Sequence, residues 1–349
     1  MRLIHAADIH LGASPSKRLF KDDRRYQKRL NECEDAFFRV LKVAKEENVD
    51  AVLLAGDTFD HPNIPQSLFK RMEEAITQAN VPVVMILGNH DAFIRPSNVS
   101  FFSHPLVHHL TKDTPSVTLG EATFIGQATK DFDYDLLKEQ IKRAISSHTV
   151  ILLHGDVFNR QDDHYLTSLN KLKQLNASYI ALGHIHQAKT LSESIAYSGN
   201  LEPHDPSETG EKGVFFVDLI TKTHRFIRTA SRLMHHHTVF VEGDCDGACL
   251  ADKILKEVPE AQRQEDLVRI ILKGTKPLEY EALPRVEARL DDAFYAYELV
   301  DERSLELDLE TLKKDYENTI IATLLDGVEV LDEALTLALK ALLETEEKR

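Results

Sequence analysis

The sequence predicts an α/β protein, because short apolar runs alternate with segments of helical periodicity. Four runs have the β-branched composition and the length of a buried parallel strand: 50–55, 81–87, 149–153 and 179–182. Four segments before and between them carry apolar residues at helical spacing: 26–47, 66–79, 136–146 and 166–175. This order predicts a parallel sheet covered by helices, with polar residues at the strand ends where such sheets bind ligands.

Composition and charge limit the class of protein. The chain has 349 residues, 42% hydrophobic, with a formal net charge of −15. This length can bury a sizeable core and accommodates two domains. The negative charge argues against bulk electrostatic binding of nucleic acid. We find neither an apolar run long enough for a membrane span nor a signal peptide, so we expect a cytoplasmic protein. We expect Cys33, Cys245 and Cys249 to be thiols, because they are few and scattered.

The first strand, 2–7, ends at Asp8-Ile9-His10. Residues i and i+2 of an extended segment point the same way, so Asp8 and His10 offer a carboxylate and an imidazole to one divalent metal. A polar surface turn is the plainer alternative. A basic run follows at 17–29, and it includes Lys17, Arg18 and Lys21. Its position suggests contact with a nucleic-acid duplex, although such runs are usually solvated helix starts.

The next two strands end in further polar motifs. The strand 50–55 stops at Gly56-Asp57-Thr58-Phe59-Asp60, and a carboxylate after a buried strand needs a metal or hydrogen bonds to be stable there. The strand 81–87 stops at Gly88-Asn89-His90-Asp91, where an amide and an imidazole follow a glycine. Ordinary turn chemistry would explain either motif alone.

The following part of the chain repeats the design. Short strands are predicted at 116–119 and 123–125, before the strand 149–153 that ends at His154-Gly155. The strand 179–182 ends at Gly183-His184-Ile185-His186, which places two imidazoles on one side. Three later strands predict a more antiparallel part: 195–198, 213–219 and 224–228.

The chain changes character after residue 234. We interpret the triplet at 235–237 as a linker rather than a metal tract, and 238–303 as a small α/β domain. The tail is helical, with apolar stripes that consist of Leu309, Leu312, Tyr316, Ile320 and Leu324, and of Leu331, Leu335, Ala338 and Leu342. Such stripes pack on their own domain or enter the groove of a partner, and both possibilities remain open.

Five strand ends therefore deliver eight candidate site residues: Asp8, His10, Asp57, Asn89, His90, His154, His184 and His186. An ordinary structural role, such as a polar turn, would explain each group of residues taken alone. Together they supply nitrogen and oxygen ligands without thiolate, enough for two ions, which suits manganese, iron or zinc. Two such ions clamp the attacking and leaving oxygens of a phosphoryl displacement and activate a bridging water, and Asp57 is the natural bridging ligand.

The five motifs, in this order, resemble those of the calcineurin-like metallophosphoesterase superfamily. Within it, the segments 8–12, 197–203 and 210–213 resemble the SbcD family, the nuclease subunit of the SbcCD double-strand-break repair complex. The resemblance implies a four-layer αββα sandwich with two mixed sheets. It also implies a metallophosphoesterase (nuclease) domain at 1–234, a small α/β capping domain at 238–303 and a helical, partner-binding C-terminal tail at 304–349.

The resemblance also implies roles for the site residues. Asp8, His10 and His186 would hold one divalent ion, Asn89, His154 and His184 the other, and Asp57 would bridge them, with manganese the expected metal. His90 would act on the substrate phosphate or protonate the leaving oxygen, and Asp60 would orient it. His61 is an alternative to Asp60 for contact with substrate, and Lys17, Arg18 and Lys21 are candidate DNA contacts.

The function implied is that of a metal-dependent exonuclease and endonuclease in DNA repair and recombination. Its expected partners are DNA, a second copy of the chain, and an SMC-like ATPase of the SbcC type bound through the tail. Two alternatives remain. A stand-alone metallophosphoesterase for nucleotides or cyclic phosphodiesters needs the same site without the tail. A scaffold that recruits an ATPase to DNA ends would not need the intact set of ligands.

Overall fold

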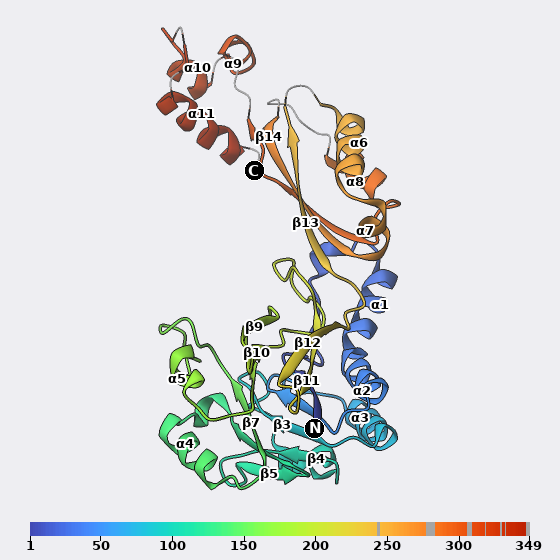
Figure 1. Ribbon diagram of the computed structural model, residues 1–349. Helices are drawn as coiled ribbons and strands as arrows, with labels where there is room; N and C mark the ends of the chain where they lie inside the picture. Colours follow the sequence, from blue (N-terminus) through green and yellow to red (C-terminus); the bar gives the residue numbers. More distant parts are fainter. Residues whose placement is uncertain are drawn as a thin grey trace. The chain divides into compact units, whose positions relative to one another are not determined.

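The computed structural model describes residues 1–242, 245–276, 283–305, 309–317, 319–328, 330–331 and 333–346 (Figure 1). The chain divides into two compact units, Met1–His235 and His236–Arg349. The boundary falls inside the histidine triplet 235–237, which therefore connects the two units as predicted, although it does so as part of strand β13, Met234–Val241. Neighbouring side chains of a strand point to opposite faces, so the three imidazoles cannot surround one ion.

The first unit contains two six-stranded mixed sheets. The first has the order β12-β11-β1-β2-β3-β4, with β1 Arg2–Ala6, β2 Ala51–Ala55, β3 Val83–Ile86, β4 Val107–His109, β11 Gly213–Asp218 and β12 Thr223–Arg228. The second has the order β5-β6-β7-β8-β10-β9, with β5 Ser116–Leu119, β6 Ala122–Gln127, β7 His148–His154, β8 Tyr179–Gly183, β9 Lys189–Ser192 and β10 Ile195–Tyr197. In each sheet, four consecutive strands run parallel.

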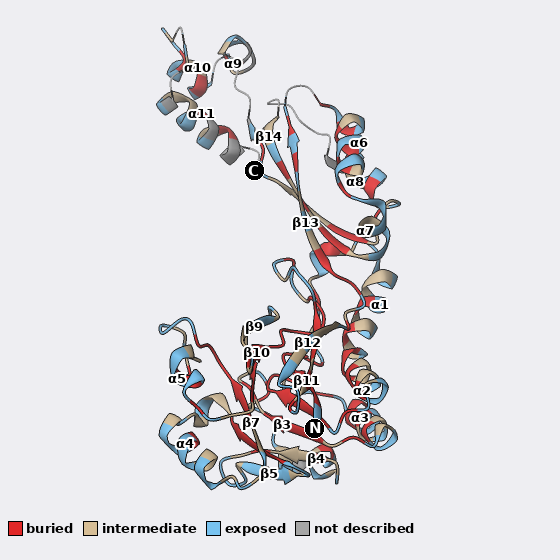
Figure 2. Cartoon of the chain, in the orientation of Figure 1, coloured by how far each residue is buried: buried red, intermediate tan, exposed pale blue. Residues whose placement is uncertain are grey.

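The central strands are buried on both faces, and this makes the layers (Figure 2). In β2, Val52 and Leu54 belong to the core between the first sheet and its helices, whereas Leu53 packs between the two sheets. The second sheet repeats the pattern, since Leu152 faces the first sheet and Ile151 faces the outer helices. The predicted four-layer αββα sandwich with two mixed sheets is confirmed.

The outer helices differ in part from the prediction. The predicted helix 26–47 is two helices, α1 (Asp23–Glu34) and α2 (Ala36–Glu46), which meet at Asp35. The predicted helix 166–175 shrinks to α5, Leu169–Lys173, while α3 (Gln66–Ala79) and α4 (Tyr134–Arg143) agree with the sequence pattern. Short 3-10 turns occur at Lys17–Leu19, Pro96–Asn98, Ser100–Ser103 and Thr129–Asp131.

The second unit combines a small sheet with helices. Its strands are β13, β14 (Leu267–Lys276), β15 (Ala296–Asp301) and β16 (Ser304–Leu305), and its first helices are α6 (Gly247–Glu257), α7 (Glu260–Glu265) and α8 (Leu283–Leu290). Leu250, Ile254 and Val286 pack on the sheet in one core. Cys245 and Cys249 form a disulfide, so our expectation that both are thiols was wrong, whereas Cys33 is a buried thiol. The four-residue spacing brings the two sulfurs together because Cys249 lies in the first turn of α6.

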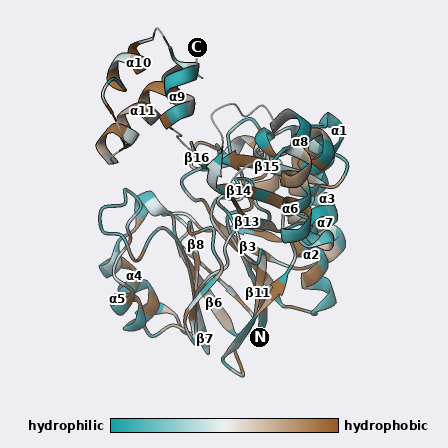
Figure 3. Ribbon diagram, turned by 90° about the horizontal axis from the view of Figure 1, so that it is seen from above, coloured by the Kyte–Doolittle hydropathy of each residue, from teal (hydrophilic) through white to brown (hydrophobic). Residues whose placement is uncertain are grey.

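The tail forms a separate apolar cluster from α9 (Leu309–Asp315), α10 (Ile320–Leu324) and α11 (Glu333–Glu346), whose surfaces mix polar and apolar residues (Figure 3). The buried residues are Leu312, Ile321, Leu325, Leu339 and Leu343. The predicted stripes were wrong at Ile320, Leu324 and Ala338, which are exposed. The turn between α9 and α10 shifts the helical phase by one residue, which a continuous periodic pattern cannot reveal. Among the described residues, we find no helix long and apolar enough to span a membrane.

Candidate metal centre

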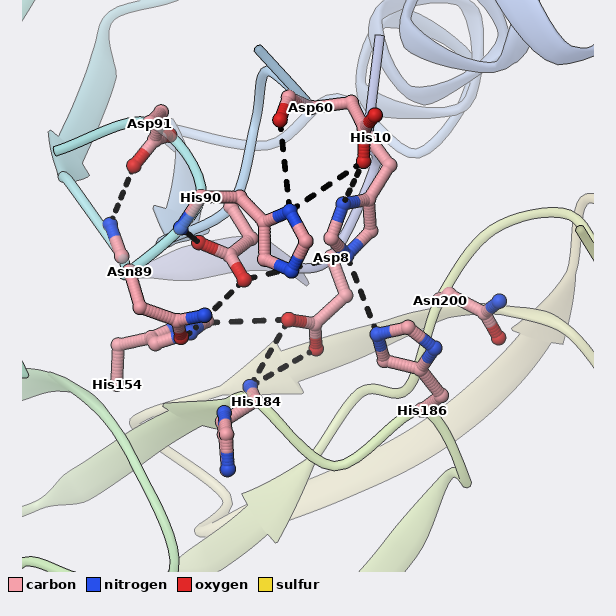
Figure 4. A network of polar contacts seen from close by, with 12 residues as sticks. Asp8, His10, Asp60, Asn89, His90, Asp91, His154, His184, His186 and Asn200 are labelled. Atoms are coloured by element: carbon pink, nitrogen blue, oxygen red, sulfur yellow. Dashed lines mark hydrogen bonds and ion pairs between the residues drawn. The ribbon is translucent and has the colours of Figure 1, made fainter. Parts of the chain in front are cut away.

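The predicted site residues follow five parallel strands, three in the first sheet and two in the second. Asp8 and His10 follow β1, Asp57 follows β2, and Asn89 and His90 follow β3. His154 ends β7, while His184 and His186 follow β8. Figure 4 shows the labelled members of this set, from Asp8 to His186, gathered in one place. The carboxyl ends of the parallel strands of both sheets therefore meet at a single polar cluster in the first unit.

The backbone at these strand ends is unusual. Asp8, His10, Asp57 and His184 have φ angles of 50°, 50°, 49° and 97°, a region that residues other than glycine seldom adopt. Such conformations persist only where the surrounding structure enforces them, and they cluster at functional sites. Gly88 allows the loop after β3 to approach the loop after β2, because a Cβ atom at Gly88 would lie 2.1 Å from Oδ1 of Asp57.

Asp57 occupies the centre of the cluster. Its Oδ1 accepts a hydrogen bond from the His90 N–H at 2.8 Å, and its Oδ2 lies 3.2 Å from Nε2 of His154 and 3.9 Å from Nε2 of His10. Burial would raise the pKa of Asp57, but the bond to His154 and the charges of both histidines lower it to about 2. One ionised carboxylate thus faces imidazoles on two sides, as a bridging metal ligand must.

His10 and His186 form one side of the cluster. Their Nε2 atoms face each other at 3.1 Å, and both side chains can share an ion with Asp8. Each ring has a carboxylate behind it, because Nδ1 of His10 lies 3.1 Å from Oδ1 of Asp60, and Nδ1 of His186 is hydrogen-bonded to Glu208. Such carboxylates fix the tautomer that leaves Nε2 available and make it a better ligand.

His154 and Asn89 form the other side. Nδ1 of His154 donates to the carbonyl of Ala55 at 2.9 Å, which directs Nε2 toward Oδ1 of Asn89, 3.0 Å away, and toward Asp57. Burial alone would lower the pKa of His154, yet Asp57 and Asp8 raise it to about 9. The carboxylates therefore stabilise positive charge at this point, which is the electrostatic condition for binding a cation.

The side chain of His184 does not point into the cluster, although it was predicted to be a metal ligand together with Asn89 and His154. Its backbone N–H donates to both carboxylate oxygens of Asp8, at 2.9 and 3.1 Å, and in Figure 4 its ring points away from Asp8. The ring lies 5.4 Å from that of His154 and 5.2 Å from that of His164. Among the described residues, the groups of acidic and histidine side chains close enough to share an ion do not include His184.

His90 lies beside the metal ligands. Its side chain is 47% exposed, and its Nδ1 lies 3.4 Å from Oδ1 of Asp60. The structure thus brings the predicted pair together, but Asp60 also binds His10, and the bond to His10 is the main reason that the pKa of Asp60 is lowered. His61 accepts a hydrogen bond from the Asn63 N–H at 3.2 Å.

Two further residues of the site escaped the sequence analysis. Asp91 is buried and accepts hydrogen bonds from the N–H groups of Thr58 and Gly88, which ties the loops after β2 and β3 together. Burial and the nearby Asp57 raise its pKa to about 7. The position of Asp91 in the motif 88–91 could have indicated that it belongs to the site. The second residue is Glu208, which contacts His186 from 22 residues away, and no sequence motif indicated it.

The basic run divides into two parts. Lys17, Arg18 and Lys21 are exposed, and the loop before them is held near the cluster by a bond from Ser16 N–H to the His204 carbonyl at 2.8 Å. Arg29, at the end of the run, is buried and paired with Glu202 at 2.6 Å. It therefore serves the fold and cannot contact DNA.

Comparison with known proteins identifies relatives of this chain. It is 27% identical to the uncharacterized metallophosphoesterase YhaO of Bacillus subtilis, over 94% of this chain and 90% of YhaO. It is 28% identical to the DNA double-strand break repair protein Mre11 of Aeropyrum pernix, over 62% of this chain and 58% of Mre11. It is 26% identical to the SbcD subunit of the nuclease SbcCD of Bacillus subtilis, over 62% of this chain and 66% of SbcD.

The donor set fits a pair of divalent ions, because carboxylate, imidazole and amide groups converge without thiolate and Asp57 touches both sides. A calcineurin-like phosphoesterase family model matches residues 1–188, which include all five polar strand ends. Members of this family use a two-metal site. The chain belongs to the calcineurin-like phosphoesterase family and is a metal-dependent phosphoester hydrolase.

Proposed function

We propose that this protein is a manganese-dependent nuclease that acts on DNA ends in double-strand-break repair. The observation that carries the proposal is the arrangement of an exposed His90, with Asp60 behind it, beside a donor set for two ions. The relatives Mre11 and SbcD, which are named for DNA repair and for nuclease activity, support DNA as the substrate class.

In the proposed reaction, Asp8, His10 and His186 would hold one ion, Asn89 and His154 would hold the other, and Asp57 would be shared by the two groups. His184 would join the second set through rotation of its side chain. Two such ions would supply a water of lowered pKa and positive charge beside the phosphoryl group. His90 donates a proton to the leaving oxygen, and Asp60 keeps the proton-bearing nitrogen oriented.

The deciding experiment is digestion of end-labelled linear duplex, hairpin and single-stranded DNA with manganese, with and without a co-expressed SMC-like ATPase. We expect metal-dependent cleavage that His90→Ala slows by ~10²–10⁴-fold. Hydrolysis of nucleotides or cyclic phosphodiesters without cleavage of DNA would favour the stand-alone phosphoesterase. Recruitment of the ATPase to DNA without any hydrolysis would favour the scaffold.

We further propose that Lys17, Arg18 and Lys21 contact duplex phosphates, because all three are exposed on the segment that begins near His10. Replacing them with glutamine should weaken DNA binding and reduce its salt dependence by about one unit of slope for each lost contact. Hydrolysis of a small chromogenic diester should stay unchanged. An unaltered salt slope would assign these residues to the solvated surface.

The tail is the proposed contact for the ATPase. Its cluster leaves Leu337 71% and Val330 80% exposed, although Leu339 and Leu343 are buried. An exposed apolar surface on a small helical segment suits docking on a partner. Leu337→Glu should abolish co-purification with the ATPase without lowering the melting temperature. Retention of the ATPase would refute this assignment. Size-exclusion chromatography with light scattering tests the proposed homodimer.

A further inference from the structure

A cavity of about 570 Å³ opens next to the metal centre in the first unit. Its apolar walls come from Ala92, Ile94, Leu110 and Ala128, which belong to the segments after β3, β4 and β6. His164 is one of its polar lining residues. The volume lies within the range of small-molecule sites, and the mixture of apolar walls with a few polar groups is typical of them.

Asn89 joins the cavity to the metal centre. It lines the cavity, and its Oδ1 lies 3.0 Å from Nε2 of His154. His164, on the cavity's edge, packs its ring 5.2 Å from that of His184. A phosphate bound at the metal centre therefore has this cavity beside it, within reach of the group esterified to that phosphate.

An exposed aromatic side chain belongs to the segment after β3 that contributes to the cavity wall. Phe93 is 76% exposed, although its two chain neighbours, Ala92 and Ile94, both line the cavity. Single exposed apolar side chains are common on protein surfaces, but an aromatic side chain beside a nucleic-acid site can stack on a base. The cavity and Phe93 are independent observations that indicate the same kind of ligand.

We propose that this cavity receives the unstacked base of the nucleotide whose phosphate lies at the metal centre, and that Phe93 stacks on a base at the rim. The inference rests on the proposed function for its DNA substrate. A flat, largely apolar ring with polar edges matches a lining that combines Ile94 and Leu110 with polar residues such as Asn89. A base must leave its helix to enter, so unpaired ends should react faster than paired ones.

Binding to the manganese-loaded full chain tests this assignment without DNA. Calorimetry should show that 2′-deoxyadenosine 5′-monophosphate binds ~5–150-fold more tightly than 2-deoxyribose 5-phosphate, because stacking of one base supplies that difference. Ala92→Leu and Ala128→Leu fill the cavity from two sides, and each should remove the preference while binding of the sugar phosphate is retained. Adenosine 5′-monophosphate tests whether the site distinguishes ribose.

Cleavage of single-stranded DNA provides the second readout. An end whose terminal nucleotide is abasic should be cut more slowly than a normal end, and Phe93→Ala should slow cleavage of the normal end. Ile220→Ala is the matched control, because Ile220 is 70% exposed in the same unit and, unlike Phe93, has no chain neighbour that lines the cavity.

The outcomes separate the two proposals. Equal affinities for the nucleotide and the sugar phosphate, or a preference that survives in both cavity-filling variants, would refute the base site. A preference that both variants abolish, in a protein that cleaves no DNA, would instead refute the nuclease and leave free nucleotides as the ligand of the same cavity.

Discussion

Two histidines between the sheets show what distinguishes the metal centre from the rest of the core. His5, in the middle of β1, and His154, at the end of β7, are both completely buried. His5 accepts a hydrogen bond from the Tyr179 hydroxyl and donates to the Leu182 carbonyl, and burial lowers its pKa to about 3. For His154, Asp57 and Asp8 overcome burial and raise the pKa to about 9. Burial alone favours a neutral ring, whereas two carboxylates create a site for positive charge.

The largest expected effect comes from removing the central carboxylate. Asp57→Ala takes away the group that faces both His10 and His154, so both sides should lose their ion and hydrolysis should stop. Metal analysis after reconstitution with manganese should fall from two ions per chain to less than one. A stoichiometry that stays unchanged would contradict the role of Asp57 as the bridge.

The second effect separates chemistry from metal binding. His90→Ala should keep both ions and lose phosphodiester cleavage by ~10²–10⁴-fold, because it removes a proton donor rather than a ligand. Asp60→Asn should show an intermediate loss of rate and weaker metal binding, since Asp60 also holds His10. Loss of metal from His90→Ala, at an unchanged rate per bound ion, would show that His90 is a ligand.

The third effect concerns one side of the site. Glu208→Gln removes the charge behind His186 and should weaken one manganese ion by ~10–100-fold while the other stays bound. Glu211→Gln is the control, because that exposed carboxylate pairs only loosely with Arg228 at 3.9 Å. Two titration phases should appear in the variant. Equal weakening of both ions would mean that Glu208 maintains the whole cluster.

The smallest effect tests the neutral histidine. The folded state keeps His5 unprotonated down to about pH 3, whereas the unfolded chain protonates it near pH 6.5. The unfolded state thus binds more protons, and stability should fall as the pH drops, by up to ~1.4 kcal/mol for each unit below 6.5. His5→Gln should lose less stability between pH 6.5 and 4.5, measured by urea unfolding with a chelator present. Parallel pH profiles would contradict the assignment.

The strand ends are the part of the structure that the sequence pattern predicted best. Apolar runs ending in Asp8, Asp57 and Asn89 predicted one polar edge, because parallel strands must carry their carboxyl ends to the same side. The helix ends were harder, since the break at Asp35 leaves apolar spacing almost unchanged. The predicted apolar stripe of the tail was inaccurate because a turn interrupts the helix without a clear sign in the sequence. As a result the buried residues are Ile321 and Leu325.

By itself the sequence determined the α/β class and the gathering of polar groups at one edge, since these depend on strand order and local periodicity, whereas the sandwich followed only from the resemblance to a known family. Only the tertiary structure decided the partners of each group. In the folded protein Asp60 contacts His10 as well as His90, and Glu208 is hydrogen-bonded to His186. The ring of His184 points away from Asp8, and the buried Arg29 forms an ion pair with Glu202. Such contacts join residues far apart in the chain, and their geometry depends on packing that no local pattern records.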